Sequence, residues 1–140
     1  MLDEAHSSPL NRLRHTIDVL EKYSLDIKEA LCYTHGAWDF DQVVAGILTA
    51  QLDLFALDNS ILICQTVRNP NMIVYHVFIA CGDLDEILEF SADQLHKEAA
   101  LRGASVLSFE GRKGWKPKLT QLGWSNEMIV MYKEVDNGQG

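Results

Sequence analysis

The sequence predicts an α/β domain in which a mixed central sheet is covered by helices on both faces. Apolar residues recur at three- and four-residue intervals before residue 52 and again after residue 83, as they do in amphipathic helices. Between these regions, the runs 61–67 and 72–81 are apolar on both faces, which is typical of strands in the middle of a sheet. The 140 residues, 47% of them hydrophobic, suit one domain.

The first helix is predicted over residues 9–22. Ser8 and Pro9 have the residue types of an N-cap and a first helical position. The apolar stripe of this helix is narrow and consists of Leu10, Leu13, Ile17 and Leu20. A helix with such a stripe can pack on its own domain or dock on a neighbouring chain.

Two shorter helical patterns follow. Ser24 opens a pattern over residues 25–33, and Asp39 can cap a third helix that runs to about Leu52. The first two helices make residues 1–37 an N-terminal helical extension of an α/β domain over residues 38–140, and the two parts are expected to form a single compact unit.

After residue 52 the pattern changes to alternation or to continuous apolar runs. Strands are predicted over 54–57, 61–67 and 72–81. The last two are joined by a four-residue loop and should form an antiparallel hairpin inside the sheet. A long helix over 83–102, a strand over 105–109, a helix over 112–122 and a final strand over 127–135 follow. Because crossovers are right-handed, the strands at 72 and 105 should be parallel neighbours.

The charge is unevenly distributed. The chain has a net charge of −8, yet residues 97–118 hold six Lys/Arg and two Asp/Glu. We do not expect nucleic acid as a partner, because a net acidic protein repels it. The basic residues of this segment are Lys97, Arg102, Arg112, Lys113, Lys116 and Lys118. A solvated helix face is the common role of such a run, and a surface for an acidic or phosphate-bearing partner is the alternative.

Cysteine usage favours a reducing compartment. The three cysteines are widely spaced and form no C-x-x-C motif, which argues against a disulfide scaffold or a zinc ribbon. The five histidines show no H-x-x-x-H spacing, so we expect no metal site.

Residues 1–9 have no apolar core of a signal peptide, and no run approaches eighteen apolar residues, so we expect no membrane contact.

Three strings carry a resemblance to a known family: FIACGDLDEIL, FEGRKGWKPKLTQLGW and MIVMYKEV. Together with the Leu122-Gly123-Trp124 exit from the last helix, they resemble small phage proteins of the GCN5-related N-acetyltransferase (GNAT) fold. The resemblance covers roughly residues 38–135. It implies a GNAT-like sheet and a protein encoded among head, portal and tail morphogenesis genes. A fold does not fix a function, so the chemistry must be checked residue by residue.

The cofactor position of that family is acidic in this chain. In the family, the pyrophosphate of acetyl-CoA binds at the N-terminus of the long central helix, where a basic, glycine-rich loop offers N–H groups. The matching residues here are Cys81-Gly82-Asp83-Leu84-Asp85-Glu86. Asp83 and Glu86 have N-cap and N3 spacing, so their carboxylates would satisfy those N–H groups. Each of the three carboxylates would cost a diphosphate on the order of 1 kcal/mol or more. We therefore expect no cofactor.

The catalytic positions are also altered. The family's usual general acid is a tyrosine four residues before the exit glycine, and this chain has Leu119 there. The strand over 72–81 contains no Asp or Glu, which leaves only His76 as a base. A histidine in an apolar strand is more commonly a core or interface residue. We therefore assign no catalytic residue, and keep an acyl-CoA-dependent N-acetyltransferase using His76 or Tyr75 as an alternative.

The expected function is that of a non-catalytic GNAT-like virion structural or accessory protein near the portal, tail or ejection apparatus. Its partners would be other virion proteins or further copies of itself, in the virion and, during assembly, in the host cytoplasm. We expect contacts through Leu13, Ile17 and Leu20 of the first helix and through Arg112, Lys113, Trp115 and Lys116, with Trp115 exposed, because Trp and Arg often anchor interfaces. The remaining alternative is a cytoplasmic regulator that binds a host protein or nucleic acid.

Overall fold

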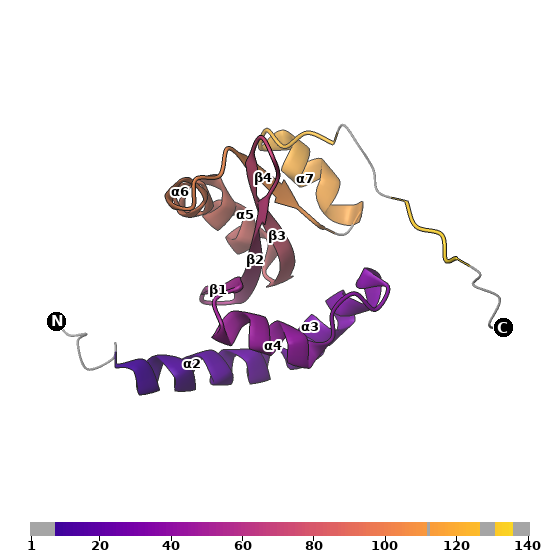
Figure 1. The fold of residues 1–140 in the computed structure, drawn as a ribbon. Helices are drawn as coiled ribbons and strands as arrows, with labels where there is room; N and C mark the ends of the chain where they lie inside the picture. Colours follow the sequence, from indigo (N-terminus) through magenta and orange to yellow (C-terminus); the bar gives the residue numbers. More distant parts are fainter. Residues whose placement is uncertain (1–7, 112, 127–130, 136–140) are drawn as a thin grey trace.

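The computed structural model describes residues 8–111, 113–126 and 131–135, which form a mixed α/β fold (Figure 1). The helices are α2 (Pro9–Lys22), α3 (Ser24–Leu31), α4 (Phe40–Leu48), α5 (Leu84–Ala92), α6 (Gln94–Leu101) and α7 (Lys116–Gln121), with 3₁₀ turns η1 (Cys32–Thr34) and η2 (Lys113–Trp115). The strands are β1 (Leu52–Ala56), β2 (Ser60–Arg68), β3 (Ile73–Gly82) and β4 (Val106–Phe109).

Within the described residues the sheet has the order β1-β2-β3-β4. The hairpin β2–β3 is antiparallel and central, and β4 pairs with β3 in parallel, which confirms both predictions. The β3–β4 pairing covers only Val74–Val77 of β3. Phe78 is skipped in the ladder with β2, because Ile63 pairs with Ile79 while Cys64 pairs with Val77. This bulge places both Phe78 and Ile79 on the same face.

Helices pack on both faces of the sheet, as the apolar runs predicted (Figure 1). The core on one face joins α2, α3 and α4 to the sheet and contains Leu20, Tyr23, Ile27, Leu31, Val43, Leu52, Ile61, Ile63, Phe78, Ile79 and Cys81. The core on the other face joins α5 and α6 to it and contains Leu62, Cys64, Tyr75, Val77, Ile87, Leu95 and Ala99.

The N-terminal helices contribute to the first of these cores. Ser8 caps α2 by accepting a hydrogen bond from the amide of Asn11, as predicted. The C-terminal end of α2 and the whole of α3 pack on the sheet, whereas the N-terminal half of α2 extends beyond it (Figure 1). Leu20 is therefore only 2% exposed, because its side chain packs in the core of its own domain. Leu13 and Ile17 remain 42% and 40% exposed.

Several element boundaries differ from the predictions. Asp39 does cap the third helix, in a capping box with Gln42, but α4 ends at Leu48. The predicted helix over 83–102 is divided at Asp93, two residues after Ser91, whose hydroxyl donates to the carbonyl of Ile87. Such back-bonding weakens a helix locally.

The last predicted helix is shorter than expected, and the last predicted strand lies partly outside the described residues. Helix α7 spans only Lys116–Gln121, and Arg112 lies outside the described residues. Of the predicted final strand, residues 127–130 lie outside the described part, and residues 131–135 form neither helix nor strand. For residues 131–135, apolar alternation indicates the two faces of a strand, but it does not identify a neighbouring strand to pair with.

Candidate functional site

The N-terminus of α5 is capped by the chain's own carboxylate. Asp83 has extended backbone angles, and its Oδ1 accepts hydrogen bonds from the amides of Asp85 at 3.0 Å and Glu86 at 3.4 Å. These are two of the N–H groups that a bound anion would need. The predicted capping by Asp83 is confirmed.

Glu86 has a different role from the one its spacing suggests. Its Oε1 accepts hydrogen bonds from the amide of Asn59, at 2.9 Å, and from the hydroxyl of Ser60. Ser60 is fully buried. Glu86 therefore joins α5 to the turn between β1 and β2. Its two partners are 26 and 27 residues away in the sequence, so no local spacing could predict these hydrogen bonds.

Gly82 allows that turn to lie directly against the start of α5. Its φ of +116° is in the region that favours glycine, and a Cβ added there would lie 2.3 Å from the carbonyl oxygen of Asn59. That same oxygen accepts a hydrogen bond from the amide of Asp83 at 3.2 Å. The space beside the α5 N-terminus is therefore filled by backbone from the β1–β2 turn.

The charge around this helix terminus is negative. Asp85 is 82% exposed and pairs with Lys118 of α7, whose Nζ lies 3.1 Å from its Oδ1. An exposed pair of this kind contributes little to stability. One lysine does not offset the three carboxylates of Asp83, Asp85 and Glu86, so the local field opposes a diphosphate.

His76 is held by two side chains from the neighbouring strand region. Its Nδ1 lies 2.6 Å from Ser108 Oγ and its Nε2 lies 2.8 Å from Glu110 Oε1. His76 and Ser108 are direct partners in the parallel β3–β4 ladder. Sequence reasoning found the histidine but missed both partners, although the predicted parallel pairing could have suggested Ser108. The arrangement of hydroxyl, imidazole and carboxylate is capable of moving a proton.

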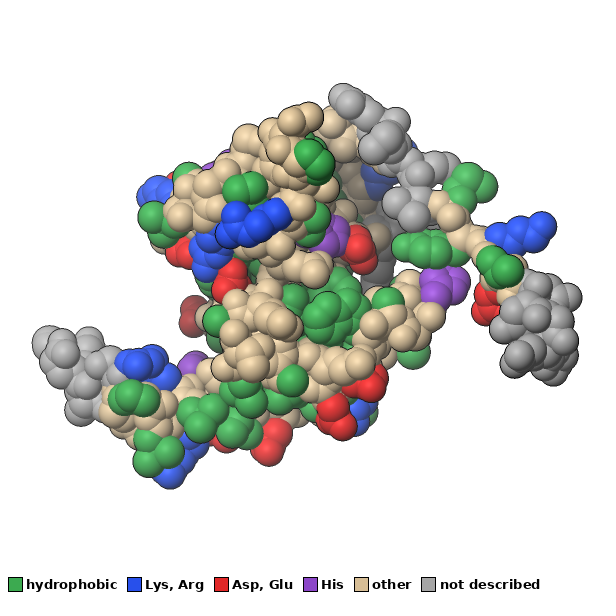
Figure 2. Space-filling view, viewed as in Figure 1, with side chains coloured by type: hydrophobic (Ala, Val, Ile, Leu, Met, Phe, Trp, Pro, Cys, Tyr) green, Lys and Arg blue, Asp and Glu red, His purple; other side chains and the backbone are tan. Residues whose placement is uncertain are grey.

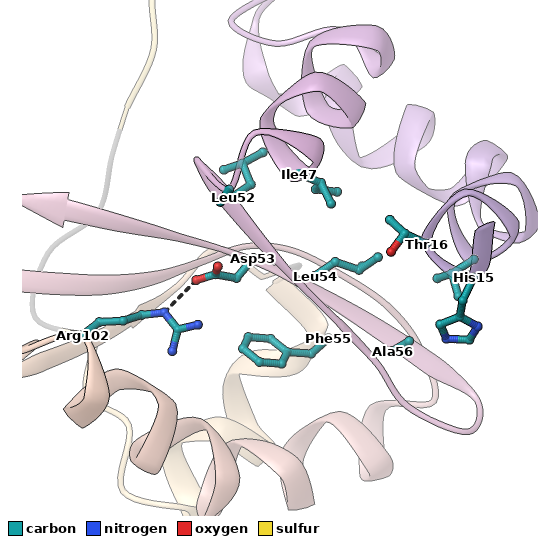
Figure 3. Close-up of a pocket in the computed structure, with 11 residues that line it drawn as sticks. His15, Thr16, Ile47, Leu52, Asp53, Leu54, Phe55, Ala56 and Arg102 are labelled. Carbon is teal, nitrogen blue, oxygen red and sulfur yellow. Dashed lines mark hydrogen bonds and ion pairs between the residues drawn. The ribbon is translucent and has the colours of Figure 1, made fainter. Parts of the chain in front are cut away.

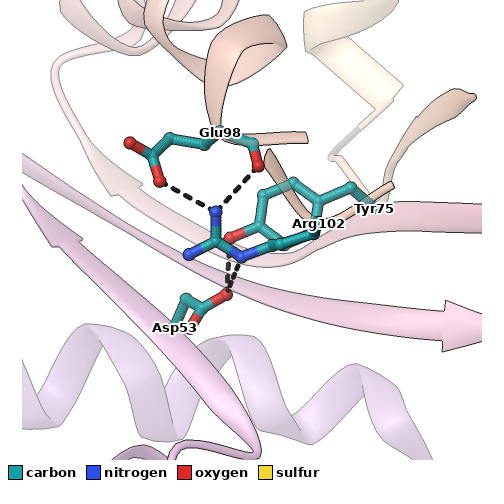
Figure 4. A network of polar contacts seen from close by, with 4 residues as sticks. All are labelled: Asp53, Tyr75, Glu98 and Arg102. Atoms are coloured by element: carbon teal, nitrogen blue, oxygen red, sulfur yellow. Dashed lines mark hydrogen bonds and ion pairs between the residues drawn. The ribbon is translucent and has the colours of Figure 1, made fainter. Parts of the chain in front are cut away.

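Tyr75, the other candidate acyltransferase group, is itself buried and lies in a part-buried polar network on the opposite face of the sheet (Figure 4). Its hydroxyl donates to Asp53 Oδ2 at 2.7 Å, and Arg102 Nε donates to the same oxygen at 2.8 Å. Arg102 also binds the carboxylate and the carbonyl of Glu98. Burial, followed by the hydrogen bond to Asp53, strongly raises the pKa of Tyr75. Burial also raises the pKa of the neighbouring Cys64 to about 12.

Several basic side chains of residues 97–118 form ion pairs with Asp or Glu side chains of the same chain. Arg102 pairs with Asp53 and Glu98, and Lys97 lies 3.6 Å from Asp93. Together with the Lys118–Asp85 pair, these contacts favour the interpretation of a charged surface paired within the domain. Arg112, one of the predicted contact residues, lies outside the described residues.

The predicted exposed position of Trp115 is wrong. Trp115 is half-buried and packs against the core of Tyr75 and Val77, with its ring centroid 5.6 Å from that of Phe109. Gly111 makes room for it, since a Cβ there would lie 3.0 Å from the indole. Of the predicted contact residues, Leu13 and Ile17 belong to α2, whereas Lys113, Trp115 and Lys116 belong to η2 and α7.

Two further properties of the described residues bear on the site. Nowhere in 8–111, 113–126 or 131–135 do three or more His, Cys, Asp or Glu side chains gather as metal ligands would. None of the helices in this part of the chain has the length and apolar character needed to span a membrane.

Comparisons with known proteins support the fold alone. The BH1408 protein from Bacillus halodurans, solved as a tetramutant, matches with a TM-score of 0.60 and 10% sequence identity. The match covers 88% of this chain and 96% of that chain. No family model matches the sequence, and no curated protein matches it. The chain thus has a mixed α/β fold similar to that of BH1408.

Proposed function

We propose that this chain is a non-catalytic GNAT-like structural or accessory component of a phage particle that acts through protein–protein contacts. The phage setting, near the portal, tail or ejection apparatus, comes from the resemblance of its sequence strings. The lack of catalysis is argued from the α5 N-terminus, where Asp83 caps the helix and Glu86 binds Asn59 and Ser60. That arrangement is the observation on which the proposal depends.

A diphosphate would have to displace these contacts before it could bind. It would replace the Asp83 carboxylate on the amides of Asp85 and Glu86, and it would approach two further carboxylates. An anion gains about 0.3–1 kcal/mol from a helix terminus, which does not offset repulsion of on the order of 1 kcal/mol per carboxylate. The net interaction at this end of α5 is therefore unfavourable.

The side chains at the family's catalytic positions add to the argument. Leu119 of α7 stands where the family has its tyrosine and carries no proton to donate. Tyr75 is fully buried, its pKa is raised by burial, and its hydroxyl already donates to Asp53. Neither residue supports acyl transfer.

One observation favours a second candidate, an N-acetyltransferase with a displaced cofactor. His76 is hydrogen-bonded to both Ser108 and Glu110, and it lies on β3, the strand that would supply the general base in the family that the sequence resembles. This candidate predicts acetyl-CoA-dependent acetylation of a polyamine or peptide panel that is lost in His76→Gln. The non-catalytic proposal predicts no difference between the wild type and His76→Gln.

Mass spectrometry of purified particles tests the proposed role. The chain should be present in particles of the encoding phage, at a constant ratio to the portal protein across density-gradient fractions. As a control, the lysate of cells infected with a capsid-deficient phage is separated on the same kind of gradient. The chain should be absent from the fractions at the density of the particles. Consistent absence from mature particles, with abundance in the infected cytoplasm, would contradict a structural role and favour a regulator.

A further inference from the structure

A hollow lies beside β1, which is an edge strand of the described sheet. The hollow, of about 430 Å³, is lined by all five β1 residues, by His15, Thr16 and Val19 of α2, and by Ile47, Ala50 and Arg102 (Figure 3). Leu54 points from the strand toward Thr16, whereas Asp53 and Phe55 point to the opposite side with Arg102 (Figure 3). The hollow therefore follows the strand and is flanked by a helix. We call it the β1 groove.

The backbone along this groove has hydrogen-bonding groups directed outward. The amide of Leu57 donates to the carbonyl of Ser60, which fixes the phase of the antiparallel β1–β2 ladder. In an antiparallel ladder, successive residues direct their backbone N–H and C=O groups to alternate sides of the strand. These groups therefore point toward β2 at Asp53 and Phe55, and toward the groove at Leu52, Leu54 and Ala56. Among the described residues, β2 is the only strand paired with β1.

Asp53 does not block this edge. An inward-pointing charge is one way in which proteins protect an edge strand. Here the carboxylate is held on the other face of the sheet by Tyr75 and Arg102, at 2.7 and 2.8 Å. A strand approaching in the plane of the sheet would not meet this charge.

Charge indicates which kind of strand the groove fits. Arg12 and Arg14 of α2 have no ion pair with a described residue, although the chain has a net charge of −8. Together with Asn11 and Asp18, they line a second hollow of about 750 Å³ that shares His15 and Thr16 with the β1 groove, so among its described lining residues two arginines outnumber one carboxylate. Basic and apolar side chains lie next to one another along this part of α2 (Figure 2). Acidic side chains on an incoming strand would complement the two arginines.

We propose that the β1 groove binds an extended acidic segment of a partner protein by strand addition to β1. Its backbone pairs with Leu52, Leu54 and Ala56, its apolar side chains face Val19 and Ile47, and its acidic side chains reach Arg12 and Arg14. This inference rests on the proposed function, because it names the kind of partner that a contact protein would take.

Fluorescence anisotropy with a labelled, N-acetylated peptide, Ser-Val-Ser-Glu-Ser-Val-Ser-Glu, tests the proposal on the full chain. Valine and glutamate share one face of this peptide when it is extended. We expect saturable binding that weakens with added salt. A peptide with Lys in place of Glu, and a Glu peptide with N-methylated backbone amides, should each bind at least about fivefold more weakly.

Variants of the protein separate the two parts of the interaction. Ala56→Pro removes one outward amide and should weaken binding at least about fivefold, whereas Ala56→Ser, which keeps the amide, should bind like the wild type. Arg12→Glu/Arg14→Glu should weaken binding at least about tenfold, and Arg68→Glu, on exposed β2 residue Arg68, should not. Circular dichroism checks that each variant is folded.

Several results would overturn the inference. Absence of binding by the Glu peptide would do so, as would binding insensitive to N-methylation or to Ala56→Pro. A concentration-dependent dimer in sedimentation velocity that Ala56→Pro dissociates would assign the groove to a second copy instead. The proposed function fails by a different readout, acetyl-CoA turnover or absence from particles, so the two failures are distinguishable.

Discussion

Glu86→Ala should destabilise the protein, because Glu86 joins α5 to the β1–β2 turn. The change removes the acceptor for the Asn59 amide and the Ser60 hydroxyl, and Ser60 is fully buried. A hydrogen bond to a charged acceptor contributes about 1.5–3 kcal/mol, and a buried donor without a partner costs about 1–3 kcal/mol. We therefore expect a loss of about 2–4 kcal/mol in the free energy of unfolding. The loss is not larger because the amide of Asn59 can form a hydrogen bond with water once the carboxylate is removed.

Urea unfolding, followed by tryptophan fluorescence and circular dichroism, measures this loss. Glu89→Ala is the matched control, because Glu89 is exposed on the same helix, and its effect should stay within about 0.5 kcal/mol. In a double-mutant cycle, Ser60→Ala should reduce the effect of Glu86→Ala. If Glu86→Ala and Glu89→Ala unfold at the same urea concentration, the proposed fastening of α5 is refuted.

Three further predictions concern stability. Gly82→Ala should cost more than about 2 kcal/mol in urea unfolding, because its Cβ would meet the Asn59 carbonyl at a φ of +116°; wild-type stability would contradict this. Leu20→Ala should cost about 2–5 kcal/mol and Leu13→Ala less than about 0.5, and equal losses would contradict the burial of Leu20. Burial raises the pKa of Cys64 from 9.0 to about 12, so the unfolded chain loses the thiol proton first as the pH rises. Stability should be unaffected below pH 9 and fall above it by up to about 1.4 kcal/mol per pH unit. Cys64→Ala should remove this slope between about pH 9 and 10, and an unchanged slope would refute the assignment.

The layered sheet could be predicted from the sequence because it depends on local pattern. Runs apolar on both faces identified β2 and β3 as central strands, and the right-handed crossover rule placed β4 parallel to β3. The caps at Ser8, Asp39 and Asp83 were also predictable, since an N-cap acts on amides two or three residues away.

What could not be predicted depends on contacts between distant residues. The burial of Leu20 follows from packing against the sheet, and a helical stripe looks the same whether it is covered by its own domain or left exposed. Trp115 is half-buried because Gly111 leaves space for its ring. The hydrogen bonds of Glu86 to the β1–β2 turn likewise need the folded chain.

The α5 N-terminus connects these observations to function. Its amides are bound by Asp83, its flank is filled by Asn59 and Ser60, and its surroundings are acidic. All three properties oppose a diphosphate for separate physical reasons: loss of donors, loss of space and like charge. A single substitution should therefore not restore binding of acetyl-CoA.

Calorimetric titration of the full chain with acetyl-CoA measures whether the acidic N-terminus of α5 excludes the diphosphate. We expect no saturable heat up to about 1 mM ligand, where even binding worth about 4 kcal/mol would be visible. Asp83→Ser, which keeps a capping oxygen without its charge, should give the same result. A micromolar Kd at one site per chain, together with crystallographic density for the diphosphate beside Gly82, would show that this helix terminus does accept the coenzyme.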